Sequence, residues 1–204
     1  MTPLRLLVYD ATQTTRSPRA LGRAWQAGSY LYRGLGRIDA AFGARSWSEA
    51  FGFLSTCEAS RTIGEIQFWG HGKWGRALIH GESFDRRTLA DSHPLRPRLT
   101  ALRERLESNA LVWFRTCETL GALAGQDFAR ALADHLGVRV AGHTFVIGFF
   151  QSGLHSLAPG TSATWSPLEG VASGTPEHPL TALASGPTRP NTVTCFDGAI
   201  PLGF

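Results

Sequence analysis

Residues 65–72, EIQFWGHG, begin as a short apolar run and end on His71 between two glycines. Residues 110–118, ALVWFRTCE, follow the same plan and lead to Cys117. Short apolar runs of this kind are typical of buried strands in a parallel sheet. Residues just past the carboxyl ends of neighbouring parallel strands share one crevice, so we expect the imidazole and the thiol to face each other there. A histidine in that position can activate a cysteine nucleophile.

The segments around these two runs alternate between strand and helix patterns. Strand, helix, strand, helix, strand at this spacing predicts an α/β fold, with helices on both faces of a mainly parallel sheet and right-handed crossovers. The predicted strands are 4–9, 63–69, 111–114, 138–141 and 145–147. The predicted helices are 20–32, 46 or 48 to 53, 98–107 and 126–136, and a hairpin is predicted at 77–84 with its turn at Gly81-Glu82.

The composition changes after Gly148. Residues 149–204 are rich in Gly, Ser, Thr and Pro and show no helical period, so we expect loops and short antiparallel strands, including 193–196. A chain of 204 residues has the size of one domain. We therefore predict an α/β core over residues 1–148 and a C-terminal extension over residues 149–204 that packs on the same domain.

Composition and charge restrict the possible partners. Hydrophobic residues make up 43% of the chain and charged residues 18%, which supports a single apolar core. The net charge of +4 comes from scattered arginines without a dense basic run, so no nucleic-acid partner is expected. No apolar run approaches the roughly 20 residues of a membrane-spanning helix. The sequence starts on a strand pattern rather than a signal peptide, so we expect a cytoplasmic protein with no membrane association.

Three cysteines, Cys57, Cys117 and Cys195, form neither a disulfide framework nor a C-x-x-C pair. This usage indicates a reducing compartment and no zinc site. Cys57 and Cys195 are interpreted as ordinary buried or half-buried thiols.

Cys117 lies where a strand passes into a turn and a helix, a place where backbone N–H groups are often available to an anion. A nearby imidazolium or helix N-terminus would lower the pKa of its thiol and favour the nucleophilic thiolate. The alternative is an inert buried cysteine, since free cysteine is among the most buried residue types.

His71 lies between Gly70 and Gly72, which allow close approach of the backbone to a ligand. The amide of Gly72 is a candidate oxyanion donor. The alternative is a turn histidine that only hydrogen-bonds its loop. Cys117 follows His71 by 46 residues, and a caspase histidine precedes its cysteine by about 50 residues.

These motifs resemble the caspase-like (clan CD) cysteine peptidases, and more closely their bacterial relatives, including the CHAT-type groups. The resemblance covers roughly residues 4–147 and includes the Gly-rich turn and helix that follow Cys117. It implies a three-layer α/β/α sandwich and a peptide or protein substrate, with no metal and no cofactor. It also implies that His71 is the general base or acid, that Cys117 is the nucleophile, and that the amides of Gly72 and Cys117 hold the oxyanion.

The chain departs from the caspase pattern beside the cysteine, where Glu118 follows instead of the caspase signature. We expect Glu118 to point to solvent or to cap the next helix; turned inward, its carboxylate would raise the pKa of the thiol. These departures leave open a catalytically silent caspase-like domain that binds a peptide or protein partner. A small-molecule enzyme of flavodoxin-like architecture is a third possibility, but the chain has no phosphate loop.

Three residues, Arg115, Glu118 and His143, are candidates for a substrate pocket. Arg115 is positioned to attract acidic side chains, although it can equally lie under the sheet. His143 can line the same crevice or be a strand-end histidine that the backbone satisfies. The spacing of His71, His80 and His143 is not helical ligand spacing, so no metal site is predicted. The sequence does not determine the oligomeric state.

Overall fold

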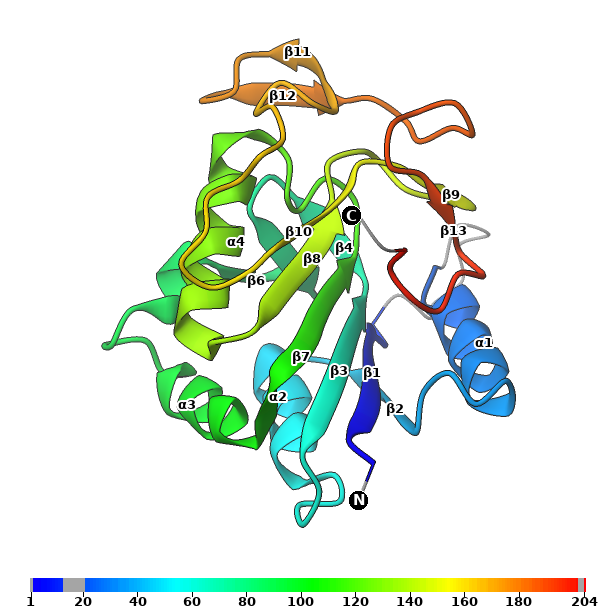
Figure 1. Ribbon diagram of the computed structural model, residues 1–204, viewed down its shortest axis with the longest axis vertical. Coiled ribbons are helices and arrows are strands. Elements are labelled where there is room, and N and C mark those ends of the chain that lie inside the picture. The colour runs from blue at the N-terminus through cyan, green and yellow to red at the C-terminus, as the bar shows by residue number, and fades with distance from the viewer. Residues whose placement is uncertain (1, 13–20, 202–203) are drawn as a thin grey trace.

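The centre of the fold is a six-stranded sheet with the strand order β10-β8-β7-β3-β1-β2 (Figure 1). The structure is a computed structural model that describes residues 2–12, 21–201 and 204. In this sheet β1, β2, β3, β7 and β8 are mutually parallel, and only β10 runs antiparallel to its neighbour β8. The strands are β1 (Leu4–Asp10), β2 (Ala40–Ala44), β3 (Ile63–Trp69), β7 (Leu106–Arg115), β8 (Arg139–His143) and β10 (Leu154–Leu157).

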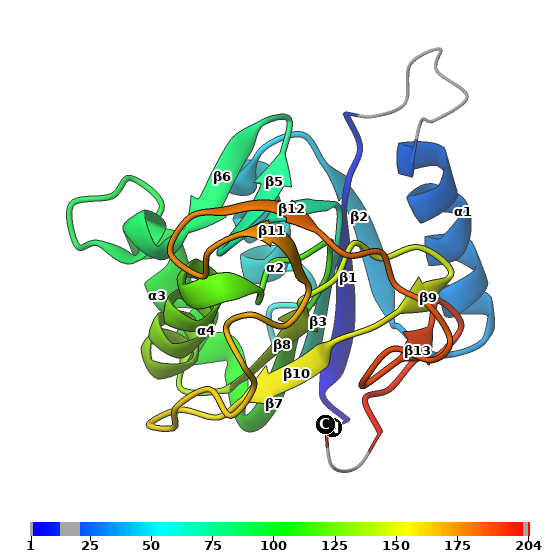
Figure 2. The ribbon, with the colours of Figure 1, turned by 90° about the horizontal axis from the view of Figure 1, so that it is seen from above.

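Helices cover both faces of this sheet (Figure 2). On one face, α2 (Trp47–Thr56), α3 (Arg96–Arg105) and α4 (Ala122–Leu136) pack on the larger apolar core, which includes Leu6 and Val8 of β1. On the other face, α1 (Leu21–Gly34) brings Tyr32 against Leu7 and Tyr9 of the same strand. Successive side chains of β1 therefore enter different cores, and both faces of the strand are buried, as expected for a parallel sheet.

The C-terminal region completes the layer that α1 begins. Strands β9 (Phe150–Gln151) and β13 (Val193–Thr194) pair antiparallel on the α1 side of the sheet (Figure 2). Val193 packs with Trp113 of β7 and Leu154 of β10 in a separate apolar cluster. A second hairpin, β11 (Val171–Gly174) and β12 (Pro179–Ala182), lies beyond the carboxyl ends of the parallel strands (Figure 1).

A small antiparallel sheet follows β3 directly. It consists of β4 (His71–Lys73), β5 (Arg76–Ile79) and β6 (Glu82–Asp85), and a short 3₁₀ helix, η1 (Arg86–Leu89), comes next. The turn between β5 and β6 is His80-Gly81, with positive φ of 52° and 79° at these residues. Two positive φ values are the signature of a two-residue type I′ hairpin turn. The predicted hairpin is thus confirmed, with its turn one residue earlier than predicted.

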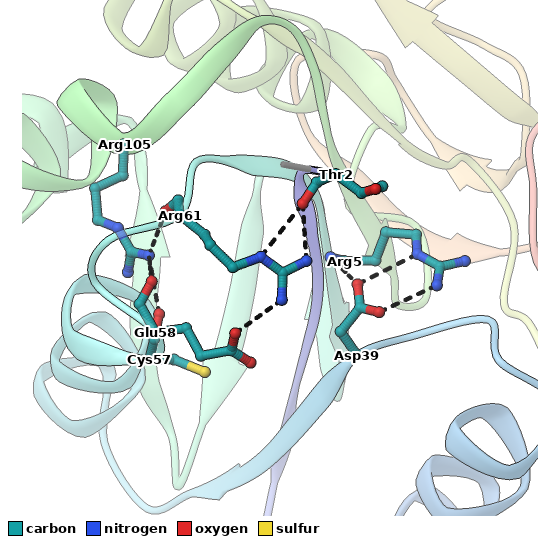
Figure 3. Close-up of polar contacts among 7 residues, drawn as sticks. All are labelled: Thr2, Arg5, Asp39, Cys57, Glu58, Arg61 and Arg105. Atoms are coloured by element: carbon teal, nitrogen blue, oxygen red, sulfur yellow. Dashed lines mark hydrogen bonds and ion pairs between the residues drawn. The ribbon is translucent and has the colours of Figure 1, made fainter.

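Arginines make hydrogen bonds and ion pairs around the amino ends of β1, β3 and β7 (Figure 3). The Arg105 guanidinium donates to the carbonyls of Leu54, Cys57 and Arg61 at 2.6, 2.9 and 2.8 Å. These contacts satisfy carbonyl groups at and beyond the end of α2, where helical partners are lacking. Cys57 is the C-cap residue of α2, so its role is to end this helix.

The predicted α/β class with a mainly parallel sheet is confirmed, as is the strand at 63–69. The helix predicted from residue 46 or 48 spans Trp47–Thr56, and the Ser46 side chain accepts from the Glu49 amide at 3.1 Å. The helix predicted at 126–136 begins earlier, at Ala122. The predicted first residue of the first helix, Ala20, lies outside the described residues.

Other elements differ from the sequence-based expectation. The helix predicted at 98–107 ends at Arg105, because Leu106 pairs with Ile63 and already belongs to β7. Strand β2 was not predicted, since its alanines and glycine carry a weak strand signal. The strand predicted at 145–147 is wrong: Val146 makes only an isolated bridge to Ala184, and β10 occupies the edge of β8.

Candidate active site

His71 and Cys117 lie two residues beyond the paired ends of adjacent strands. Trp69, the last residue of β3, pairs with Arg115, the last residue of β7. The chain then continues to His71 on one side and to Cys117 on the other, and both residues line one cavity of about 470 Å³. The structure therefore brings the two predicted residues into a shared cavity, here called the site cavity.

The site cavity has two walls and a floor. Helix α1 supplies the first wall, with lining residues between Leu21 and Tyr32. Residues 147–149, Gln151, Cys195 and Phe196 supply the second wall. The strand ends with Trp69 and Arg115 close it from below. Most of this lining is aliphatic or aromatic, which is usual for a small-ligand site.

The Cys117 thiol is held in its neutral form. Its Sγ donates weakly to the Ile147 carbonyl at 3.9 Å. Burial raises the pKa of the thiol above its usual value, and the Glu118 carboxylate raises it further. The Cys117 amide and the Lys73 charge oppose this shift but do not cancel it. The thiolate is therefore a minor species at neutral pH, and a base must take the proton for attack to occur.

Glu118 is buried, contrary to the expectation that it points to solvent or caps the next helix. It is 4% exposed, and the residue that caps α4 is Gly121. The Glu118 carboxylate pairs with Lys73 Nζ of β4 at 3.2 Å, while its amide donates to the Phe145 carbonyl at 2.9 Å. A positive φ of 44° turns the residue inward. Within the described residues, its second oxygen, Oε2, has no hydrogen-bond partner.

His71 is partly buried and contacts α1. Its ring meets the Trp25 ring edge-on, with centroids 5.4 Å apart and an angle of 78° between the planes. Among the described residues, no hydrogen bond engages its ring nitrogens, nor does one join it to Cys117. The imidazole is thus available as a base, and Trp25 fixes one side of it.

Gly72 allows the two loops of the site to touch. A Cβ atom at this position would lie 2.5 Å from the Cys117 carbonyl oxygen and would also clash with Thr119 Oγ1. The Thr119 carbonyl accepts from the Gly75 amide at 2.9 Å, which joins the same loops from the other end. Gly72 itself pairs with Ala77 in the small sheet and is not part of the cavity lining. Gly70 takes that place.

Arg115 is a buried guanidinium that ties the C-terminal region to the sheet. It donates to Gln151 Oε1 at 2.9 Å, to the Tyr32 hydroxyl at 2.5 Å, and to the carbonyls of Asp197 and Thr194 at 2.9 and 3.0 Å. Its carbon Cζ lies 4.4 Å from the centroid of Trp113. Burial lowers the pKa of the guanidinium. Arg115 therefore lines the site cavity, but most of its donors are already used.

His143 does not reach the site cavity. It is fully buried, with Nδ1 next to the Ser152 carbonyl at 3.2 Å and Nε2 accepting from Trp113 Nε1 at 3.4 Å. Burial lowers the pKa of His143 to about 3, so the ring is neutral. This is the arrangement of a histidine satisfied by its surroundings.

Several lining residues were not predicted from the sequence. Trp25 belongs to a predicted helix, but its periodicity gave no reason to place it beside His71. Phe149, Phe196 and Cys195 come from the region without regular pattern. The second wall is attached to α1 by the Tyr32 hydroxyl, which donates to the Cys195 carbonyl at 2.8 Å, and to the segment after α1 by a contact between Arg37 and the Phe196 carbonyl.

The described residues contain no group of three or more His, Cys, Asp and Glu side chains arranged to hold a metal ion. None of the described helices combines the length and apolarity needed to cross a bilayer. Comparison with protein-family models, with curated proteins and with solved structures finds no match to this chain.

Proposed function

We propose that this chain is a caspase-like cysteine peptidase that hydrolyses peptide bonds through Cys117 and His71. The observation that carries the proposal is the shared cavity: a thiol and an imidazole follow the paired ends of β3 and β7 and line one apolar space. In this proposal the sheet and its helices form a caspase-like α/β/α sandwich. The three free cysteines suit a reducing, cytoplasmic setting.

The reaction would be acyl transfer in two stages. Cys117 Sγ attacks the carbonyl carbon while its proton passes to His71, and the carbon–nitrogen bond breaks as His71 protonates the leaving amine. A water molecule, deprotonated by His71, then hydrolyses the thioester, releases the acid and restores the thiol. The Cys117 amide is the proposed oxyanion donor, because the described residues offer it no acceptor other than its own sulfur.

Gly72 is a weaker second donor. Its position outside the cavity lining means that the oxyanion contact would have to form when substrate moves the loop. The proposed role of this glycine is therefore first of all to let the two loops approach each other.

One observation favours a second candidate, a catalytically silent domain that binds a peptide or protein partner in the same cavity. The Cys117 thiol is hydrogen-bonded to the Ile147 carbonyl rather than to His71, and burial disfavours ionisation of the thiol. A protein that only binds would retain the cavity without needing the proton transfer.

Labelling with a peptidyl thiol-reactive probe separates the two candidates. Wild type, Cys117→Ala and His71→Ala are compared by intact mass and peptide mapping. A peptidase gives one adduct, which is lost in Cys117→Ala and slowed about a hundredfold in His71→Ala, the usual size of a general-base contribution. Equal, slow labelling of Cys57, Cys117 and Cys195 would reject the peptidase and favour the binding domain. Circular dichroism of each variant confirms that the fold is retained.

A further inference from the structure

We propose that the site cavity selects a large uncharged side chain, aromatic or aliphatic, next to the peptide bond that is cut. This inference rests on the proposed function in that the side chain belongs to the attacked peptide. It names a substrate class that is neither acidic nor basic.

The walls of the site cavity are built from apolar side chains supplied by distant parts of the chain. Helix α1 contributes Leu21 and Leu31, and the second wall contributes Ile147, Phe149 and Phe196. A cavity of about 470 Å³ falls in the range of sites that enclose a whole small ligand. A small polar side chain would leave much of this apolar surface in water, whereas a phenylalanine or leucine side chain would cover it.

Large apolar side chains remain exposed around the opening of this cavity. Leu21 and Leu31 are 46% and 45% exposed on one wall, and Phe149 and Phe196 are each 52% exposed on the other. The two phenylalanine rings meet edge-on, with centroids 5.7 Å apart. Single exposed apolar residues are common on proteins, but a cluster on both sides of one opening marks a place where apolar surface is to be covered.

The charges of the lining argue against an ionised side chain. Arg115 is the permanent cation of the lining, and a lysine or arginine of the substrate would be repelled by it. A carboxylate would need two parallel N–H donors for a strong fork-shaped contact. Four of the five guanidinium N–H groups of Arg115 already donate to protein acceptors. An acidic side chain would thus exchange its water for mainly apolar walls and the single guanidinium N–H group that the described residues leave free.

Trp25 connects the selected side chain with the chemistry. Its ring lines the site cavity and also meets the His71 ring edge-on at 5.4 Å. A bulky side chain bound against Trp25 would therefore lie beside the base that has to take the Cys117 proton. Contact with Trp25 would thus both bind the substrate side chain and position the scissile bond.

Two alanines of α1 provide a matched test. Ala24 and Ala27 are both exposed on the helix, but only Ala24 lines the site cavity. Ala24→Trp fills part of the space, while Ala27→Trp adds the same group elsewhere. Wild type and both variants are incubated with a peptide mixture that varies one position through all residues, and mass spectrometry identifies the cut bonds.

We expect wild-type cuts next to Phe, Tyr, Leu or Met, and a rate at least tenfold lower in Ala24→Trp with Ala27→Trp unchanged. Alkylation of Cys117 by iodoacetamide should stay the same in both, because this small reagent fits in the part of the cavity that Ala24→Trp leaves open. A second pair guards against misfolding: Phe196→Ser should also slow cutting, and Leu180→Ser, an exposed leucine of β12, should not. Cuts next to Asp, Glu, Lys or Arg, or equal rates for the paired variants, would overturn the inference.

A binding measurement separates failure of the inference from failure of the proposed function. Peptides of the form Ala-Ala-X-Ala-Ala are titrated calorimetrically into Cys117→Ala. The inference predicts at least tenfold tighter binding for X as Phe or Leu than for X as Asp or Lys. If the Phe and Leu peptides bind more tightly but wild type cuts no peptide, the proposed peptidase function is rejected and the proposed selectivity of the cavity is retained. Cutting without that preference would retain the peptidase and reject the selectivity.

Discussion

Lys73 Nζ lies 3.2 Å from Glu118 Oε1, and this ion pair joins the strand that begins at His71 to the residue after Cys117. The two charges act on the thiol in opposite directions, since Glu118 raises and Lys73 lowers the pKa of Cys117. The pair thus links the two halves of the candidate site both mechanically and electrostatically.

Replacing Glu118 and replacing Lys73 should shift the reactivity of the Cys117 thiol in opposite directions. Glu118→Gln should lower the pKa of Cys117 and speed its alkylation by iodoacetamide at pH 7.5, whereas Lys73→Met should raise the pKa and slow it. Each pKa unit corresponds to about a tenfold change in the thiolate fraction at neutral pH. The rate at Cys117 is measured against pH by peptide mapping, with the exposed Glu104→Gln as the control. Shifts of the same sign in both variants would contradict the arrangement.

The buried His143 should make the protein acid-sensitive. Its folded pKa of about 3 lies below the usual 6.5, so the unfolded chain takes up a proton that the folded chain refuses. Stability from this group is complete above pH 6.5 and is lost as the pH falls toward 3, with a total of about 5 kcal/mol. Urea unfolding of wild type should therefore show a steeper pH dependence than His143→Gln over this window. The exposed His178→Gln should behave like wild type, and equal slopes for all three would refute the assignment.

Replacement of Gly72 should separate the two loops of the site. Gly72→Ala places a methyl group against the Cys117 carbonyl and Thr119, and we expect a loss of about 2 kcal/mol in unfolding free energy. The rate of Cys117 alkylation should change together with the stability, because the displaced carbonyl belongs to Cys117 itself. Gly34→Ala is the control, since a Cβ there meets nothing within 4 Å. Stability is measured by thermal unfolding. An unchanged unfolding temperature in Gly72→Ala would contradict the prediction, because the two loops would then accommodate the methyl group without loss of stability.

Loss of Arg115 should release the second wall of the site cavity. Arg115→Met removes the donors to Gln151, Thr194 and Asp197, and among the described residues it leaves the buried Gln151 Oε1 without a hydrogen-bond partner. We expect a loss of about 3 kcal/mol or more and faster amide exchange over residues 190–198. The half-exposed Arg130→Met should leave both quantities unchanged. Hydrogen-exchange mass spectrometry gives the local readout, and protection that persists in this segment would contradict the assigned role.

The parallel sheet was predictable because its strands carry their own signals. The runs at 63–69 and 111–114 are apolar throughout, as strands buried on both faces must be, and Gly137 stops the helix before β8 with a left-handed φ of 71°. The juxtaposition of His71 and Cys117 follows from this topology. Strand β2 and the true end of α3 were not predictable, because pairing with β1 and β3 overrides weak local preferences.

The walls of the candidate site could not be predicted from the sequence for a different reason. Phe149 and Phe196 come from a region where hydrogen bonds and turns, rather than periodicity, determine the path. The inward turn of Glu118 depends on Lys73, a residue of another small sheet. Such contacts join segments far apart in the chain, and no local pattern encodes them.

The attachment of the second wall to Tyr32 has a consequence for the order of assembly during synthesis. Domains begin to fold while the ribosome is still adding residues. His71 and Cys117 are made long before Cys195 and Phe196, so a growing chain carries both residues while one wall of the site cavity is still missing. Under the proposed function, recognition of a bulky side chain would therefore arise later than the pairing of His71 with Cys117, because it needs the wall that Phe196 completes.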